Sequence, residues 1–166
     1  HALENEKNYL KTSQWSAPKT ALITGGLGTL GIEIAKWLIN EGTKYLLLMG
    51  KTSLPSRAEW ENIEDKALKQ KISMLLDIES KGVTIKYVSI DVTDEQKTRL
   101  TIYETEQEWQ NSIDGVFHLA GITTDSIRIS DMSNEIFQNV LAVKIKGALV
   151  LHEIFKKTSL NCFVLF

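Results

Sequence analysis

Short apolar runs alternate with longer segments in which apolar residues recur every three or four positions along most of this chain. A short apolar run is typical of a strand covered on both faces, and apolar recurrence at helical spacing is typical of a helix with one buried side. We predict strands that begin at Ala21, Tyr45, Thr84, Gly115 and Cys162. Because strands and helices alternate, the pattern predicts an α/β fold, a Rossmann-like three-layer αβα arrangement of a parallel sheet with right-handed crossovers.

The first apolar run ends in a glycine-rich turn that leads into a predicted helix over residues 29–40. We expect Gly25 to let the chain reverse, Gly28 to let phosphates approach because it has no Cβ, and Gly31 to let the helix pack closely on the strand. A dinucleotide pyrophosphate site requires this order of strand, turn and helix, because free N–H groups and the positive end of the helix dipole then meet the phosphates.

The residues after the second predicted strand indicate the type of cofactor. A site for NAD usually places an acid there to bind the ribose 2′-hydroxyl. This chain instead has Gly50-Lys51-Thr52-Ser53, and an ammonium with two hydroxyls suits a 2′-phosphate. The sequence therefore favours NADPH, with Lys51 as an ordinary solvated lysine the alternative.

Two more strand ends carry candidate residues. Asp91 follows the third strand, and its spacing alone favours local hydrogen bonding over a cofactor role. Ala120 and Gly121 follow the fourth strand and are small enough for a ring to lie against the backbone. We interpret His118 as a core or strand-end histidine, because it has no acidic neighbour in sequence that would orient it for acid–base chemistry.

Two further helices are predicted. One follows Pro55 and continues to about Lys81, with apolar residues on one face and charged residues expected to coat a solvated face. The other spans about 133–157, and Lys144 falls on its inward stripe, which comprises Phe137, Leu141, Ala148, Leu151 and Phe155. A lysine facing a core is rarely placed there without a partner or a function, although its amine can also snorkel outward.

Composition excludes several classes of protein. The 166 residues suffice for one domain, and a net charge of −2 leaves no basic footprint for nucleic acid. The single cysteine, Cys162, excludes an internal disulfide and a cysteine metal cluster, and we expect a buried thiol in a reducing, cytoplasmic setting without a metal site. No apolar stretch is long enough to cross a membrane.

Both ends of the chain suggest a piece of a longer polypeptide. Residues 1–19 are mostly polar and are predicted to be a linker from a preceding domain, whereas 20–166 form the NADP-binding domain. The chain stops at Phe166 inside an apolar run, where a complete doubly wound sheet would continue.

Several segments together resemble the ketoreductase domains of modular polyketide synthases, within the short-chain dehydrogenase/reductase superfamily. The resemblance runs from about Thr20 to Phe166 and rests on the residues 24–31 (TGGLGTLG), 91–94 (DVTD), 116–122 (VFHLAGI), 139–148 (NVLAVKIKGA) and 151–153 (LHE), with 50–60 (GKTSLPSRAEW) in support. The chain would then contain the N-terminal five strands of such a domain.

The resemblance implies a reaction and its residues. In that family NADPH reduces the β-keto group of an acyl thioester on an acyl carrier protein, a partner that belongs with other domains of the same synthase. Lys144 matches the family's catalytic lysine, whose charge favours an ionised tyrosine. The implied cofactor-binding residues are Thr24, Gly25, Gly28, Thr29, Leu30, Gly31, Lys51, Thr52, Asp91, Val92, Ala120 and Gly121.

This chain departs from the family pattern in three places. Lys51 stands where the family usually has arginine, so a 2′-phosphate would meet a point charge instead of a bidentate fork. The catalytic serine and tyrosine are expected beyond Phe166, so this piece alone should reduce nothing. The loop Thr123-Thr124-Asp125 matches the family's Leu-Asp-Asp only at Asp125, which we expect to orient the substrate.

Two alternatives remain, a structural ketoreductase-like domain without activity and a stand-alone short-chain dehydrogenase.

Overall fold

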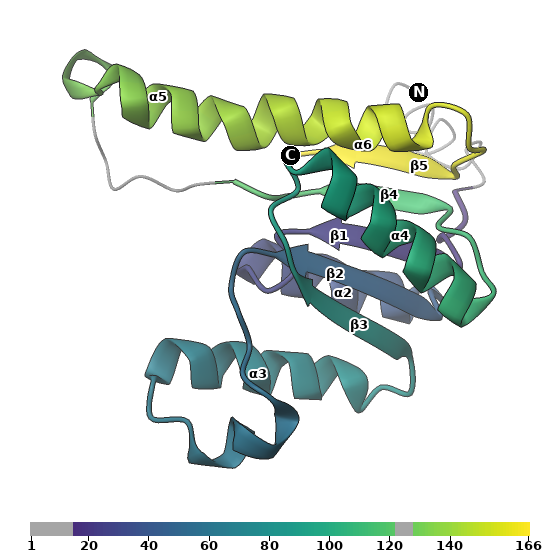
Figure 1. The fold of residues 1–166 in the computed structure, drawn as a ribbon. Helices are drawn as coiled ribbons and strands as arrows, with labels where there is room; N and C mark the ends of the chain where they lie inside the picture. The colour runs from purple at the N-terminus through teal and green to yellow at the C-terminus, as the bar shows by residue number, and fades with distance from the viewer. Residues whose placement is uncertain (1–14, 122–127) are drawn as a thin grey trace, which may run out of the picture.

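A five-stranded parallel sheet lies at the centre of the computed structural model, which describes residues 15–121 and 128–166 (Figure 1). The strand order is β3-β2-β1-β4-β5, and every neighbouring pair is parallel. The strands are β1 (Thr20–Thr24), β2 (Tyr45–Gly50), β3 (Thr84–Ser89), β4 (Gly115–His118) and β5 (Cys162–Leu165). The predicted Rossmann-like α/β fold is confirmed.

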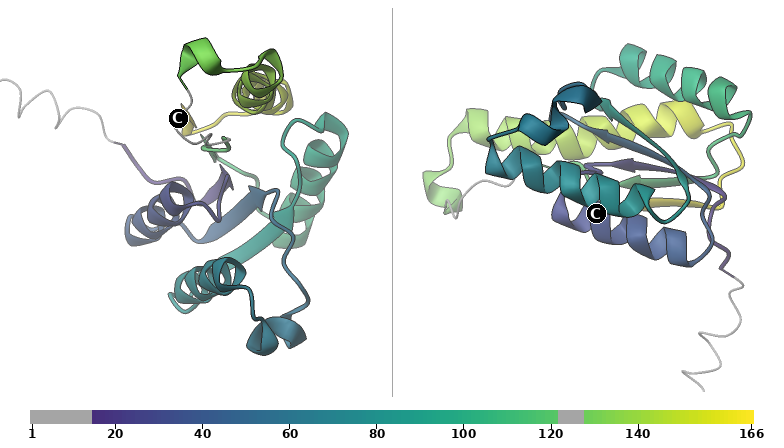
Figure 2. Two further views of the ribbon diagram at one scale, coloured as in Figure 1. Left: turned by 90° about the vertical axis from the view of Figure 1, so that its left-hand side faces the viewer. Right: turned by 90° about the horizontal axis from the view of Figure 1, so that it is seen from below.

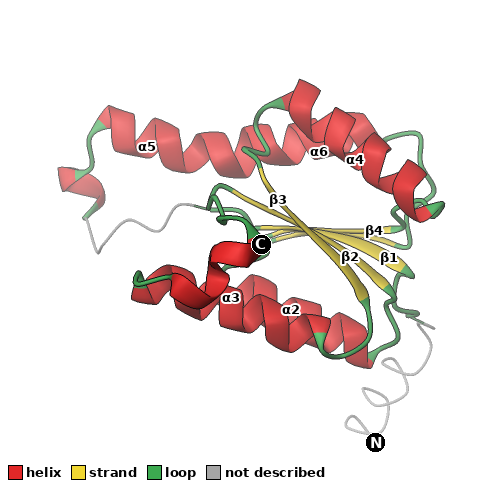
Figure 3. Ribbon diagram, turned by 60° about the horizontal axis from the view of Figure 1, so that its bottom comes forward, coloured by secondary structure: helices red, strands yellow, loops and turns green. Residues whose placement is uncertain are grey.

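Helices cover both faces of the sheet and complete three layers (Figures 2 and 3). One face carries α2 (Thr29–Asn40) and α3 (Lys66–Glu79). The other face carries α4 (Glu95–Trp109), α5 (Asn134–Leu141) and α6 (Gly147–Phe155). Among the described residues, no helix combines the length and apolarity that a membrane span requires, and a cytoplasmic location stays a prediction.

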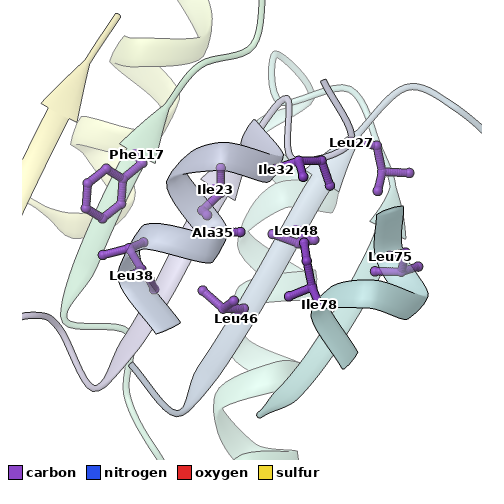
Figure 4. Packing of buried hydrophobic residues seen from close by; sticks show 11 residues of the cluster. Ile23, Leu27, Ile32, Ala35, Leu38, Leu46, Leu48, Leu75, Ile78 and Phe117 are labelled. Carbon is purple, nitrogen blue, oxygen red and sulfur yellow. The ribbon is translucent and has the colours of Figure 1, made fainter. Parts of the chain in front are cut away.

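The strands read as unbroken apolar runs because each face of the sheet has its own core. Ile23, Leu46 and Leu48 point toward α2 and α3 (Figure 4), and Ala21 belongs to the same cluster. The intervening Leu22, Leu47 and Met49 pack on the opposite side with residues of α4 and α6. Successive strand residues alternate between faces, so a strand covered on both sides must be apolar throughout.

The segment between β2 and β3 is less regular than predicted. A short 3₁₀ helix, η1 (Arg57–Asn62), precedes α3, which begins only at Lys66. Asp65 sets this boundary, because its side chain accepts hydrogen bonds from the backbone N–H groups of Ala67 and Leu68.

The segment between β4 and β5 matches the predicted helix in extent but contains η3 (Ala142–Lys146), a π-helical turn between α5 and α6. A π-turn holds more residues than an α-turn. Before Leu151, the inward-facing positions therefore lie one residue closer to the N-terminus than a regular α-helix would place them. Val143 and Gly147 are buried, whereas Lys144 and Ala148 are half-buried and Phe137 is 48% exposed. The predicted stripe is therefore correct at Leu151 and Phe155 and wrong before them.

Two other expectations concern the edges of the fold. Trp15 stacks on Trp37 of α2 with 4.7 Å between ring centroids, and residues 1–14 of the predicted linker lie outside the described residues. Cys162 is half-buried rather than buried, and burial raises the pKa of its thiol.

Candidate functional site

A cavity of about 660 Å³ lies at the carboxyl end of the sheet, where β1, β2, β3 and β4 end. Ligands of open α/β sheets bind at this edge. All the residues predicted to bind the cofactor, together with Lys144, line this one space: Thr24, Gly25, Gly28, Thr29, Leu30, Gly31, Lys51, Thr52, Asp91, Val92, Ala120 and Gly121. Asp125 lies outside the described residues.

The glycine turn between β1 and α2 has the geometry that the sequence predicted. Gly25 has a φ of 71°, a conformation that favours glycine. A Cβ on Gly31 would lie 2.4 Å from the Gly25 carbonyl oxygen, so only glycine lets the first turn of α2 pack this closely against the turn that follows β1. No side chain among the described residues caps α2. Its first backbone N–H groups therefore remain available to an anion.

One corner of the cavity is formed by the residues that follow β2 and β3. The Lys51 Nζ lies 2.7 Å from Asp91 Oδ2, and Asp91 Oδ1 accepts hydrogen bonds from the Thr93 backbone N–H and hydroxyl. Burial acts to raise the pKa of Asp91, but the hydrogen bonds from Lys51 and Thr93 outweigh it and hold this pKa below its ordinary value. The local role predicted for Asp91 is real, and the same carboxylate also lines the cavity.

Two residues of this corner were missed by the sequence analysis. The Lys71 ammonium of α3 donates a 2.7 Å hydrogen bond to the Thr52 hydroxyl, so Lys71 does not belong to a fully solvated face. The Tyr87 hydroxyl donates to the Thr52 carbonyl at 2.6 Å, and burial raises the pKa of Tyr87 to about 12. Both contacts join residues far apart in sequence. The only sequence signal was that Lys71 precedes the core residue Ile72, which indicated that Lys71 lies near the buried side of its helix.

The opposite end of the cavity contains Lys144. Its side chain lies against Gly121, where an added Cβ would be 3.1 Å from Lys144 Cε. The Lys144 ammonium donates to the Phe166 carbonyl at 2.5 Å. The sequence interpretation placed this amine among core side chains, whereas the structure places it half-buried at the rim, on the same edge of the sheet as the glycine turn.

His118 connects the end of β4 to the two neighbouring elements. Its Nδ1 lies 2.7 Å from the Thr24 hydroxyl, and its Nε2 lies 3.2 Å from the Val143 carbonyl in η3. A carbonyl accepts only, so Nε2 carries the proton and Nδ1 accepts from Thr24. Burial lowers the pKa of His118 and outweighs the hydrogen bonds to the Val143 and Lys144 backbone, which act to raise it, so the neutral form is favoured.

Comparison of the sequence with known protein families identifies the family to which this chain belongs. The profile of the KR domain matches residues 19–166. The chain belongs to the ketoreductase (KR) domain family of polyketide synthases. The predicted resemblance is thereby confirmed for most of the chain.

Relatives of this KR domain are large synthases. The 6-methylsalicylic acid synthase of Arthrobotrys oligospora is 36% identical over 156 residues, which cover 94% of this chain and 9% of that synthase. A phenolphthiocerol/phthiocerol polyketide synthase of Mycobacterium tuberculosis is 34% identical, over 93% of this chain and 8% of that protein. The first ketoreductase of the tylosin PKS superposes with a TM-score of 0.71 at 25% identity, over 93% of this chain and 30% of that one.

Proposed function

We propose that this chain forms the NADPH-binding part of a ketoreductase that reduces the β-keto group of an acyl thioester carried on an acyl carrier protein. The observation that carries the proposal is that the glycine turn, the Lys51–Thr52 corner and Lys144 line one cavity. Partner domains of the same synthase are expected around it, because its relatives are many times longer than this chain.

The cavity suits NADPH at each of its parts. The uncapped start of α2 offers backbone N–H groups to a diphosphate. Lys51 and Thr52 line the corner in which a 2′-phosphate would lie, and Ala120 with Gly121 leaves room beside the backbone for a ring. When bound, the reduced nicotinamide supplies the hydride.

Lys144 is the residue of this chain that we assign to catalysis. An ammonium at the rim of the cavity lowers the pKa of a nearby phenol and so favours its ionised form. The phenol is expected to belong to a tyrosine that follows Phe166 in the sequence, with a serine beside it. Tyr87 does not fit this role, because it lies at the Thr52 corner and donates its proton to the Thr52 carbonyl.

The test is an assay with a diketide thioester and NADPH. It uses the parent protein, meaning the longer polypeptide that we propose contains this chain. We expect turnover, and we expect Lys144→Ala to lower kcat far more than it weakens NADPH binding. Lys146→Ala is the matched control, because Lys146 is an exposed lysine of the same π-turn.

Two results would count against the proposal. No turnover with serine and tyrosine intact would reject reduction, and retained NADPH binding in that case would favour a structural ketoreductase-like domain. Equal losses of turnover and cofactor affinity in Lys144→Ala would reject a catalytic role for Lys144.

A further inference from the structure

Lys71 reaches the cavity from α3, an element to which no cofactor role has been assigned. The helix is fixed on the sheet by Ile72, Leu75 and Ile78, all of which are buried. Lys71 precedes the first of these, and its half-buried side chain extends to the Thr52 hydroxyl at 2.7 Å. Its ammonium is therefore held at the Lys51–Thr52 corner by a helix with a fixed position.

The charges at this corner show why a second lysine matters. Lys51 is paired with Asp91 at 2.7 Å, so these two residues together contribute no net charge. Lys71 takes part in none of the ion pairs found within residues 15–121 and 128–166. The positive charge available to an anion at this corner is thus that of Lys71.

The hydrogen bonds at Thr52 leave donors, not acceptors, available to an anion. The Thr52 hydroxyl accepts from Lys71, so its own proton remains available to an acceptor. The Thr52 carbonyl oxygen accepts a 2.6 Å hydrogen bond from the Tyr87 hydroxyl. This bond orients the Thr52 backbone, and it leaves no unpaired Thr52 carbonyl oxygen to repel an anion at the corner. The corner therefore presents an ammonium and a hydroxyl proton side by side.

We infer that Lys71 binds the 2′-phosphate of NADPH together with Thr52 and determines the preference for NADPH over NADH. This inference rests on the proposed function, because it assigns the 2′-phosphate to the corner opposite Lys144. Lys51 screens Asp91 from the phosphate, and Lys71 supplies the attraction. A phosphate dianion recruits such a cation through charge-assisted hydrogen bonds, which are stronger than neutral ones.

The experiment compares two nucleotides that differ by this phosphate. Binding of 2′,5′-ADP and of 5′-AMP to the parent protein is measured by calorimetry for the wild type, Lys71→Met and Lys71→Arg. We expect Lys71→Met to weaken 2′,5′-ADP binding by roughly tenfold or more, the scale of one charged hydrogen bond, and to change 5′-AMP binding less than twofold. Lys71→Arg should restore most of the loss because it keeps the charge.

Lys69→Met is the matched control, since Lys69 is an exposed lysine on the same helix. It should leave both affinities unchanged. In steady-state assays, Lys71→Met should raise KM for NADPH by a larger factor than it raises KM for NADH. The melting temperature of each variant is measured alongside, and retained 5′-AMP affinity shows that the site is folded.

The possible outcomes separate this inference from the proposed function. If the wild type binds 2′,5′-ADP no better than 5′-AMP, NADPH preference itself is wrong. If the wild type discriminates and Lys71→Met discriminates equally well, only the role of Lys71 is overturned. Equal weakening of both nucleotides by Lys71→Met would make Lys71 a structural residue and would also overturn the inference.

Discussion

His118 and Thr24 join the ends of two neighbouring strands, with the imidazole Nδ1 2.7 Å from the threonine hydroxyl. The same hydroxyl accepts from the Ala120 backbone N–H at 3.2 Å. Through Nε2 the imidazole also reaches the Val143 carbonyl. One buried side chain thus connects the strand before the glycine turn to the π-turn that carries Lys144.

Replacing His118 by alanine should destabilise the fold. His118 is 1% exposed, so its removal leaves the Thr24 hydroxyl and the Val143 carbonyl without this partner, at a cost of about 1–3 kcal/mol. Chemical denaturation of the variant measures the loss in the free energy of unfolding. His152→Ala, at an exposed histidine of α6, should change it by less than about 0.5 kcal/mol. A His118→Ala protein as stable as the wild type would show that these hydrogen bonds contribute nothing net.

Stability should also fall as the pH is lowered through the range in which His118 titrates. Burial sets the pKa of His118 below its ordinary value of 6.5. The unfolded chain then binds a proton at a higher pH than the folded one. The contribution of neutral His118 to the free energy of unfolding is therefore complete above about pH 6.5, and it is lost as the pH falls toward the pKa of His118 in the folded protein. Melting temperatures between pH 8 and 5 measure this slope. It should be smaller in His118→Asn, and an unchanged slope in that variant would assign the effect to other groups.

Gly31→Ala should damage the turn even though alanine usually stabilises a helix. The new Cβ would lie 2.4 Å from the Gly25 carbonyl oxygen and 2.9 Å from Gly26 Cα. These neighbours are backbone atoms, so relief requires a shift of the turn, and the cost should be about 1–3 kcal/mol. Nucleotide affinity should fall with it, as calorimetry would show.

Gly82→Ala provides the contrast for that variant. Gly82 has a φ of 75° but no described heavy atom within 4 Å of an added Cβ, so its cost is the conformational one of about 1–2 kcal/mol. Because Gly82 lies at the opposite end of α3 from the cavity lining, nucleotide affinity should not change. If Gly31→Ala bound nucleotide as tightly as Gly82→Ala, close packing at Gly31 would have no bearing on the site.

The strands and the lining of the cavity could be predicted because their determinants are local. An apolar run with covered faces, a glycine turn and the residue after each strand are all read from neighbouring positions. The parallel sheet then brings its carboxyl ends together, so Thr24, Lys51, Asp91 and Ala120 meet without any further information.

The parts that escaped prediction depend on contacts between distant segments. The π-turn has no local apolar pattern of its own, and it brings Gly147 so close to His118 that a Cβ would lie 2.8 Å from the imidazole Cε1. A glycine inside an otherwise regular helical pattern was the one available sign of that close approach. Lys71 likewise reads as a surface lysine until the position of α3 beside Thr52 is known.

Gly121→Ala should test whether turnover depends on where the Lys144 ammonium lies, because the variant moves this side chain without removing it. An added Cβ would lie 3.1 Å from Lys144 Cε and 3.4 Å from its Nζ. The obstructed atoms are the end of a flexible side chain, so the lysine can move aside, and the free energy of unfolding should change by less than about 0.5 kcal/mol. The displaced ammonium would no longer be fixed beside the cavity, so kcat with a diketide thioester should fall by about tenfold. Turnover equal to that of the wild type would show that catalysis tolerates this shift of Lys144, and a fall in stability as large as that of Gly31→Ala would show that Gly121 serves packing instead.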